Sequence, residues 1–170
     1  MQIKEIESYI SKIPDYPKPG ILFYDISTLV FDNNAFSSTI NKLIDIAKKY
    51  EFDLVASIDA RGFLFGSVIA HQLNKGLIMV RKKNKLPGKT ISYEYELEYG
   101  NDTLEINIDA KNKKFLLVDD LLATGGTANA ALELLAKAGG QTSCFLSLIE
   151  LTFLNGRKKI SVPMESLIQY

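Results

Sequence analysis

The chain has 170 residues, 46% of them hydrophobic and 24% charged, so it is long enough for one globular domain with a buried core. Twenty basic and twenty acidic residues give a net charge of zero, which argues against an overall basic surface for nucleic acid or an anionic membrane. No apolar run approaches the roughly 18 residues of a membrane-spanning helix, and the N-terminus lacks the apolar core of a signal peptide. We therefore expect a single cytoplasmic domain over residues 1–170 that binds neither nucleic acid nor membrane.

The two rarest reactive residue types restrict the chemistry further. The single cysteine, Cys144, excludes an internal disulfide and a cysteine-rich zinc site. The single histidine, His71, excludes a multi-histidine metal site within one chain. Because His71 lies inside a helical pattern, we expect it to be structural rather than a catalytic base.

The first part of the chain predicts two helices separated by a turn. Apolar residues at positions 3, 6, 9, 10 and 13 have helical spacing. Three prolines and a glycine in residues 14–20 exclude a helix or a central strand, so we expect an ordered turn or a hood-like loop there. The side chains of residues 32–34 offer N-caps for a helix that continues to about Tyr50. Residues 1–34 are expected to form a small N-terminal hood.

Short apolar runs alternate with helical patterns in the rest of the chain. The expected strands are residues 54–58, 77–80, 113–118 and 143–151. A helix that continues to Asn74 follows the first run, and a helix from about Thr127 to Ala138 follows the third. This alternation predicts an α/β fold with a mainly parallel sheet flanked by helices.

A long polar stretch separates the second and third predicted strands. Residues 93–98 and 104–108 flank a turn at Gly100, Asn101 and Asp102, so they are candidates for a hairpin. Long polar insertions in compact α/β domains often cover active sites. We therefore expect a flexible flap and hairpin within residues 81–108.

The most informative segment is residues 115–127. A buried strand is expected to end at Asp119 and Asp120, and a Thr-Gly-Gly-Thr turn then leads into a helix. Ligands of open α/β sheets bind at the carboxyl ends of strands, and free amides at a helix N-terminus attract anions. Two acids would repel a phosphate bound beside them, whereas neutral sugar hydroxyls would donate hydrogen bonds to them. The segment therefore indicates a ribose 5-phosphate site, with an Asx turn and a helix N-cap as the alternative.

Residues 118–127, VDDLLATGGT, resemble the phosphoribosyl-pyrophosphate motif of the type I phosphoribosyltransferases. Five further segments resemble the adenine branch of that family: YPKPGILF at 16–23, DARGFLFG at 59–66, VRKKNKLPG at 80–88, LEYG at 97–100 and SLIELT at 147–152. The resemblance implies transfer of a ribosyl 5-phosphate from phosphoribosyl pyrophosphate to adenine, which gives AMP and pyrophosphate in purine salvage. It also implies Mg²⁺ as a cofactor, bound mainly through substrate and water without a direct protein ligand.

The resemblance assigns roles to the motif and to two other segments. The 5-phosphate would be held by Ala123, Thr124, Gly125, Gly126 and Thr127. The ribose hydroxyls would be held by Asp119 and Asp120. Pyrophosphate would be bound by Asp59, Ala60, Arg61, Gly62, Arg81, Lys82 and Lys85. In the family the first of these loops often contains a cis peptide, here between Asp59 and Ala60, and the arginine corresponding to Arg81 reaches a neighbouring subunit, which implies a homodimer.

The base-binding residues are also implied by the resemblance. The purine would lie between Phe23 and Leu121, and the backbone from Leu22 to Tyr24 would read its amino-pyrimidine edge. Adenine-specific relatives usually carry an arginine where this chain has Tyr24. The effect of this departure on base choice or affinity is left open.

The expected catalytic residues are Glu98, Arg61 and Asp120. Relatives that use 6-oxopurines have an aspartate where this chain has Ala123, so Glu98 is the expected acid for the imidazole side of the purine. Tyr99 is expected to close the flap over the site.

Two other functions remain as alternatives. One is another purine phosphoribosyltransferase, acting on xanthine or on hypoxanthine and guanine. The other is a non-catalytic RNA-binding regulator of the same fold, which would need a basic RNA-binding face. Zero net charge argues against that face.

Overall fold

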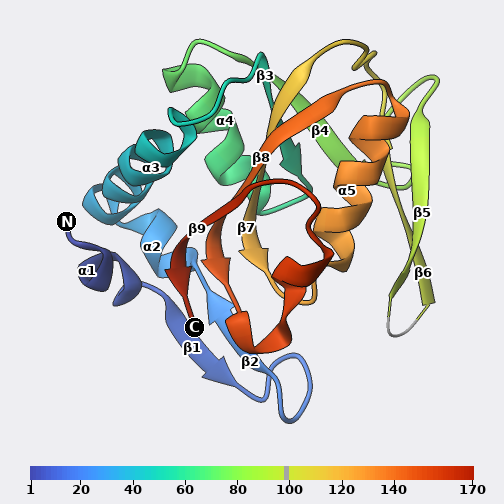
Figure 1. The fold of residues 1–170 in the computed structure, drawn as a ribbon. Coiled ribbons are helices and arrows are strands. Elements are labelled where there is room, and N and C mark those ends of the chain that lie inside the picture. Colours follow the sequence, from blue (N-terminus) through green and yellow to red (C-terminus); the bar gives the residue numbers. More distant parts are fainter. Residues whose placement is uncertain (98–99) are drawn as a thin grey trace. The chain divides into compact units, whose positions relative to one another are not determined.

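The computed structural model describes residues 1–97 and 100–170 (Figure 1). Two compact units, Met1–Leu43 and Ile44–Tyr170, divide the chain. In chain order the elements are α1 (Ile3–Glu7), β1 (Ser11–Pro14), β2 (Leu22–Asp25), α2 (Ser27–Phe31), α3 (Asn33–Ala47), β3 (Leu54–Ile58), α4 (Gly62–Gln72), β4 (Gly76–Lys82), β5 (Ile91–Leu97), β6 (Gly100–Ile106), β7 (Lys114–Leu122), α5 (Gly126–Lys137), β8 (Gln141–Glu150), η1 (Thr152–Leu154), η2 (Gly156–Lys159) and β9 (Met164–Gln169). The prediction of a single domain over residues 1–170 stays a prediction.

The first unit contains a two-stranded antiparallel sheet, β1 and β2. The proline-rich segment connects the two strands, as predicted, and the peptide bond before Pro17 is cis. The carboxylate of Asp15 accepts a hydrogen bond of 2.7 Å from the backbone N–H of Gly20, so the turn is closed by its own side chain.

The helices of the first unit differ from the sequence expectation. The helix predicted over residues 3–13 is wrong beyond Glu7, because residues 11–14 pair with β2 and obtain their backbone hydrogen bonds from that strand. The N-cap signal at 32–34 is confirmed, since Asp32 accepts a hydrogen bond of 2.8 Å from the N–H of Ala35. The preceding helix α2 was missed, and Ile26 at its N-cap makes no side-chain cap.

The second unit is built on a seven-stranded sheet with the order β5-β6-β4-β3-β7-β8-β9. The five strands from β4 to β9 are parallel, and β6 and β5 extend the sheet antiparallel at the β4 edge. This arrangement confirms the predicted α/β fold with a mainly parallel sheet. The last strand, β9, was missed because its sequence mixes polar and apolar residues without a long apolar run.

The order of the strands determines where a ligand site can form. The connection β3-α4-β4 moves one way along the sheet and β7-α5-β8 moves the other way, so right-handed crossovers place α4 and α5 on opposite faces (Figure 1). The neighbouring strands β3 and β7 are therefore the topological switch point. The loops that leave their carboxyl ends open into one crevice.

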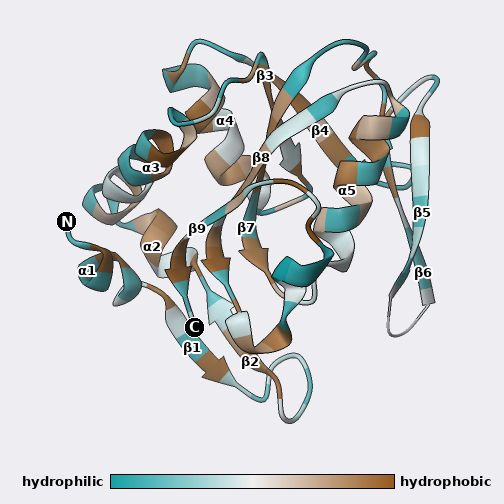
Figure 2. Ribbon diagram, in the orientation of Figure 1, coloured by the Kyte–Doolittle hydropathy of each residue, from teal (hydrophilic) through white to brown (hydrophobic). Residues whose placement is uncertain are grey.

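The core of the second unit lies along the central strands. The side chains of Phe115 and Phe145 are fully buried on β7 and β8, together with Phe65 of α4. Figure 2 shows long hydrophobic stretches on β7, β8 and β9, whereas β5 is paler over most of its length. Strand β7 continues to Leu122, so Asp119 and Asp120 lie within the strand rather than at its end.

The predicted hairpin is confirmed as β5 and β6, but the predicted turn is wrong. Residues 100–102 belong to β6, where they pair with Leu97, Glu96 and Tyr95 of β5. Cross-strand polar contacts hold these turn-type residues in an extended conformation; for example, the side-chain amide of Asn101 donates to Glu94 at 3.0 Å. No helix in the described residues is long and apolar enough to cross a membrane.

Candidate active site

A cavity of about 300 Å³ opens at the carboxyl ends of β3 and β7, at the switch point of the sheet. Its walls are the loop after β3, the end of β7 and the turn into α5, with one lysine from β4. The residues that line it are Ile58, Asp59, Ala60, Arg61, Lys82, Asp119, Asp120, Leu121, Leu122, Ala123, Thr124, Gly125, Gly126, Thr127 and Ala128. The predicted ribose- and phosphate-binding residues are therefore in one place.

The loop after β3 forms one wall. The peptide bond between Asp59 and Ala60 is cis, as the resemblance implied. The Nε atom of Arg81, on the neighbouring strand β4, lies 3.1 Å from Oδ2 of Asp59. The Nη1 atom of Arg81 also donates to the carbonyl of Lys85 at 3.3 Å. Arg81 therefore holds the loop after β3 through Asp59. Neither Arg81 nor Lys85 lines the cavity.

Arg61 and Gly62 connect this wall to the end of β7. The Nε atom of Arg61 lies 2.8 Å from Oδ2 of Asp120. A Cβ atom on Gly62 would lie 2.9 Å from Oδ1 of Asp119 and 3.0 Å from the carbonyl of Val118. Gly62 is therefore needed for α4 to begin directly against β7, and this buried glycine supports the site rather than lining it.

The two neighbouring acids have perturbed titration. Burial raises the pKa of both carboxyls, and repulsion from Asp120 raises the pKa of Asp119 further, whereas the Arg61 guanidinium acts to lower the pKa of Asp120. The backbone N–H of Asp120 donates to Oδ1 of Asp119 at 2.9 Å. Carboxylate oxygens from two consecutive residues that line one cavity suit a ligand with two adjacent hydroxyl groups.

The turn after β7 forms the opposite wall. Gly125 is the N-cap of α5 and has a φ of +81°, a conformation that L side chains rarely adopt. Because α5 begins at Gly126, the amides of its first turn have no acceptors within the helix. These amides and the N-terminal end of the helix dipole give residues 123–127 the properties of an anion site.

Comparison with known proteins agrees with this geometry. The sequence pattern of the family described as "Phosphoribosyl transferase domain" matches residues 23–161. The chain is 48% identical over 168 residues to the adenine phosphoribosyltransferase of Rhodospirillum centenum, and the match covers 98% of each chain. The crystal structure of adenine phosphoribosyltransferase from Thermoanaerobacter pseudethanolicus is similar with a TM-score of 0.96 and 47% identity, over 99% of this chain and 100% of that one. The Saccharomyces cerevisiae enzyme, solved with D-2,5-dideoxy-2,5-imino-altritol 1,6-bisphosphate and adenine, has a TM-score of 0.91 and 34% identity over 97% of both chains. The chain belongs to the adenine phosphoribosyltransferase family.

Five residues expected to act in an adenine phosphoribosyltransferase are not among the described residues that line the cavity. Leu22, Phe23 and Tyr24 form part of β2 in the first unit, where Tyr24 is buried and Leu22 is exposed. Glu98 and Tyr99 lie outside the described residues. The base-binding, catalytic and flap roles of these five residues stay predictions.

A polar network between the hairpin and the anion site was missed by sequence reasoning. The Nζ atom of Lys82 lies 2.8 Å from Oδ2 of Asp102. The hydroxyl of Tyr95 lies 3.4 Å from the same carboxylate oxygen and 3.4 Å from the Thr127 hydroxyl. The residues come from β4, β5, β6 and α5, so both the pairing of the strands and the position of α5 beside them bring the residues together. The network connects the hairpin β5–β6 to Thr127, a residue that the adenine phosphoribosyltransferase family is expected to use for the 5-phosphate.

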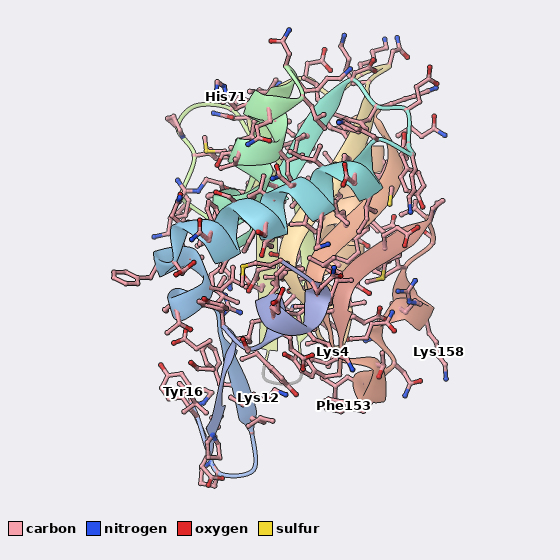
Figure 3. The ribbon with its side chains drawn as sticks, turned by 90° about the vertical axis from the view of Figure 1, so that its left-hand side faces the viewer. Lys4, Lys12, Tyr16, His71, Phe153 and Lys158 are labelled. Carbon is pink, nitrogen blue, oxygen red and sulfur yellow. The ribbon has the colours of Figure 1, made fainter. Side chains whose placement is uncertain are left out.

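The single histidine and the single cysteine lie away from this cavity in the adenine phosphoribosyltransferase fold. His71 is exposed in the last turn of α4 (Figure 3). Arg61 is the N-cap of the same helix, so about 15 Å of helix separates the two residues. Cys144 is fully buried on β8, and burial raises the pKa of its thiol to about 11. Both positions agree with structural rather than chemical roles.

Proposed function

We propose that the protein is an adenine phosphoribosyltransferase, which converts adenine and phosphoribosyl pyrophosphate to AMP and pyrophosphate in purine salvage. The bond between C1 of the ribose and the diphosphate oxygen breaks, a bond from C1 to N9 of adenine forms, and the N9 proton is released. The observation that carries the proposal is the meeting of two acids and an anion-binding turn in one cavity, opposite Arg61.

The ribose 5-phosphate part of the substrate is assigned to the wall formed by β7 and α5. Residues 123–127 would bind the 5-phosphate through backbone amides and the hydroxyls of Thr124 and Thr127. Asp119 and Asp120 would accept hydrogen bonds from the ribose 2′- and 3′-hydroxyls. Hydroxyl donors would also favour the charged form of both acids and so offset their raised pKa.

The pyrophosphate is assigned to the wall formed by the loop after β3. Arg61 would move its charge from Asp120 toward the diphosphate, where it stabilises the negative charge of the leaving group. Lys82 adds a second cation at the edge of the cavity. Arg81 and Lys85 do not line the cavity of their own chain. We propose that they complete pyrophosphate binding in a homodimer, in which Arg81 would leave Asp59 and act at the neighbouring subunit's site.

The base-binding roles are those that the family resemblance implies, residue by residue. Adenine would lie against Phe23 and Leu121, and the backbone of Leu22 to Tyr24 would read its edge. Glu98 would manage the proton on the imidazole side of the purine, and Tyr99 would close the flap.

A Mg²⁺ ion that arrives with the diphosphate would need few ligands from the protein. Mg²⁺ is usually held by one or two carboxylates, waters and substrate phosphates. In the part of the chain that the structure describes, no three His, Cys, Asp or Glu residues form a group that could hold a metal, and Asp59 and Asp120 are each paired with an arginine. We therefore propose Mg²⁺ bound mainly through substrate and water. When bound there, it neutralises charge on the departing diphosphate. The proposed location is the cytoplasm, because a single free cysteine, Cys144, suits a reducing compartment.

One assay tests the base. The purified protein is incubated with phosphoribosyl pyrophosphate, Mg²⁺ and adenine, hypoxanthine, guanine, xanthine or orotate in turn, and nucleotide formation is followed by chromatography. We expect AMP from adenine and at least 100-fold lower kcat/KM for the other bases, because a site built to read the amino group leaves polar groups unpaired with 6-oxopurines. Turnover of another base without AMP formation would make the protein a sibling enzyme. No turnover with any base, together with RNA binding at physiological salt, would support the regulator instead.

A further inference from the structure

The anion-binding turn, residues 123–127, is in contact with Gly156, which is about 30 residues away in sequence. A Cβ atom on Gly125 would lie 2.5 Å from the carbonyl oxygen of Gly156. A Cβ atom on Gly156 would overlap the carbonyl oxygen of Ala123 and lie 2.9 Å from the N atom of Gly125. The backbones of the two segments are therefore in direct contact, and this approach requires a glycine on each side.

An ion pair holds the segment that carries Gly156. The Nε atom of Arg157 donates to Oε1 of Glu150 at 2.8 Å, and its Nη2 atom lies 2.5 Å from Oε2. The Nη1 atom of Arg157 donates to the carbonyl of Met164 at 2.8 Å. The Glu150 carboxylate is buried and also accepts a hydrogen bond of 2.7 Å from Ser166. A bidentate pair of this kind constrains orientation as well as distance.

Glu150, the acid of this ion pair, is next to the end of β7, the strand that leads into the turn. Glu150 is paired in register with Leu122, the last residue of β7, and the N–H of Leu151 donates to the carbonyl of Leu122 at 2.9 Å. The Arg157–Glu150 pair therefore connects the residue after Gly156 to the strand pair β7–β8, immediately before residues 123–127 begin.

The same contacts argue against a ligand role for Arg157. Its three side-chain nitrogens all bind acceptors of this chain. A second cavity of about 390 Å³ lies beside the pair, and its one acid, Glu150, is the partner of Arg157. The guanidinium is therefore committed to holding the backbone around Gly156 in place.

We propose that Gly156, held by the Arg157–Glu150 ion pair, positions the phosphate-binding turn, so that these three residues set the enzyme's affinity for the 5-phosphate without touching it. This inference rests on the proposed function of residues 123–127. Hydrogen bonds weaken steeply with distance and angle, so a small displacement of the turn costs affinity. A misplacement of about 1 Å in a binding site can cost about 100-fold.

The test is the affinity for ribose 5-phosphate, measured by calorimetry on the full chain. Gly156→Ala places a methyl group against Ala123 and should weaken binding about 10- to 100-fold. Arg157→Lys, which keeps the charge but loses the two-pronged contact, should weaken it about 3- to 10-fold. Lys158→Ala is the matched control, because Lys158 belongs to the same turn, is exposed and projects from the surface (Figure 3). This control should bind within about twofold of the wild type.

Steady-state kinetics separate positioning from a general loss of structure. In Gly156→Ala the KM for phosphoribosyl pyrophosphate should rise with the dissociation constant, because the new methyl group would meet Ala123 and Gly125 of the turn after β7. The value of kcat at saturation and the affinity for pyrophosphate should stay within about threefold, because pyrophosphate is assigned to the other wall of the cavity. Wild-type affinity for ribose 5-phosphate in a folded Gly156→Ala variant would overturn the inference. If that variant does not fold, the affinity for ribose 5-phosphate is measured in Arg157→Lys and Glu150→Gln, and wild-type affinity in both would overturn the inference. A wild-type protein that fails to bind ribose 5-phosphate would instead remove the proposed function of the turn.

Discussion

The Nε atom of Arg61 lies 2.8 Å from Oδ2 of Asp120, so a cation from the loop after β3 partly neutralises the acids of β7. The proposed substrate brings its own negative charge to this cation and its own hydroxyl donors to the acids. Binding would thus exchange one internal ion pair for two contacts with the ligand. Arg61 and Asp120 should respond to substitution as a coupled pair.

Removing Arg61 should change both substrate affinity and pH dependence. Arg61→Ala removes the group that lowers the pKa of Asp120, so this pKa rises further and the charged acceptor for ribose is lost at a higher pH. We expect kcat/KM for phosphoribosyl pyrophosphate to fall about 100-fold and the acid limb of its pH profile to move to higher pH. Arg61→Lys keeps the charge and should move the limb less. An acid limb that stays in place in Arg61→Ala would contradict the electrostatic coupling.

Asp119 should reduce stability while it supports binding. Its pKa in the folded chain is raised, so the folded protein keeps a proton that the unfolded chain releases, and its contribution to stability is lost as the pH rises through the folded pKa. Asp119→Asn should therefore raise Tm, more at pH 8 than at pH 5, by about 2–4 °C for each kcal/mol gained. Its affinity for ribose 5-phosphate should fall because a carboxylate acceptor is lost.

Glu150 should affect stability in the opposite direction to Asp119, because its pKa is shifted the other way. Its pKa is lowered, chiefly by Arg157, so its contribution to stability is present at neutral pH and is lost as the pH falls through the folded pKa. Glu150→Gln should lower Tm at pH 7 and differ less from the wild type in acid. Thermal unfolding at several pH values measures both variants. The same sign for the two substitutions would show that these carboxyls do not titrate as described.

Two glycines at the ends of α5 form a matched pair. Gly125 has a φ of +81° and Gly139 a φ of +84°, so alanine at either position should cost about 1–2 kcal/mol of stability through backbone conformation. Only at Gly125 would the new methyl group lie 2.5 Å from the carbonyl of Gly156; at Gly139 the nearest atom, Cα of Lys111, is 3.3 Å away. Gly125→Ala should raise the KM for phosphoribosyl pyrophosphate at least 10-fold, whereas Gly139→Ala should leave it unchanged. Equal KM values in the two variants would rule out a specific role for the turn.

Tyr95 should affect phosphate binding through Thr127. Its hydroxyl lies 3.4 Å from that of Thr127, and a neutral hydrogen bond contributes about 1 kcal/mol, so Tyr95→Phe should raise the KM for phosphoribosyl pyrophosphate about 3- to 5-fold. Burial raises the pKa of the phenol, so the effect should be constant over pH 6–9. In a Thr127→Ala background the same change should have little effect. Additive losses in the double variant would indicate that the two hydroxyls act independently.

Glu98 and Asp120 should separate turnover from affinity. Glu98→Gln removes the proposed proton acceptor and should lower kcat about 100-fold or more, with a smaller change in KM. Asp120→Asn should mainly raise the KM for phosphoribosyl pyrophosphate, because it weakens the hydrogen bonds to the ribose hydroxyls. Steady-state kinetics with both substrates varied measures the two effects. Equal losses in both parameters for both variants would count against separate roles.

Elements whose signals lie within one short stretch of the chain could be predicted from the sequence alone. Strand β3 occupies the predicted residues 54–58, because a short apolar run between polar segments has one favourable arrangement in a buried sheet. The motif at residues 118–127 is equally local, since strand, acids, turn and helix follow one another directly. The Thr-Gly-Gly-Thr turn and the two acids before it could therefore be singled out as a candidate site before any fold was known.

Features that depend on pairing between distant segments could be found only in the folded structure. Residues 11–14 became a strand because β2 supplied their hydrogen-bond partners, although their apolar spacing is helical. The Arg61–Asp120 pair, the network around Asp102 and the contact of Gly156 with Gly125 each join separate elements. Such contacts are set by strand order, register and crossover direction, which arise from the packing of the whole chain rather than from the residues beside each site.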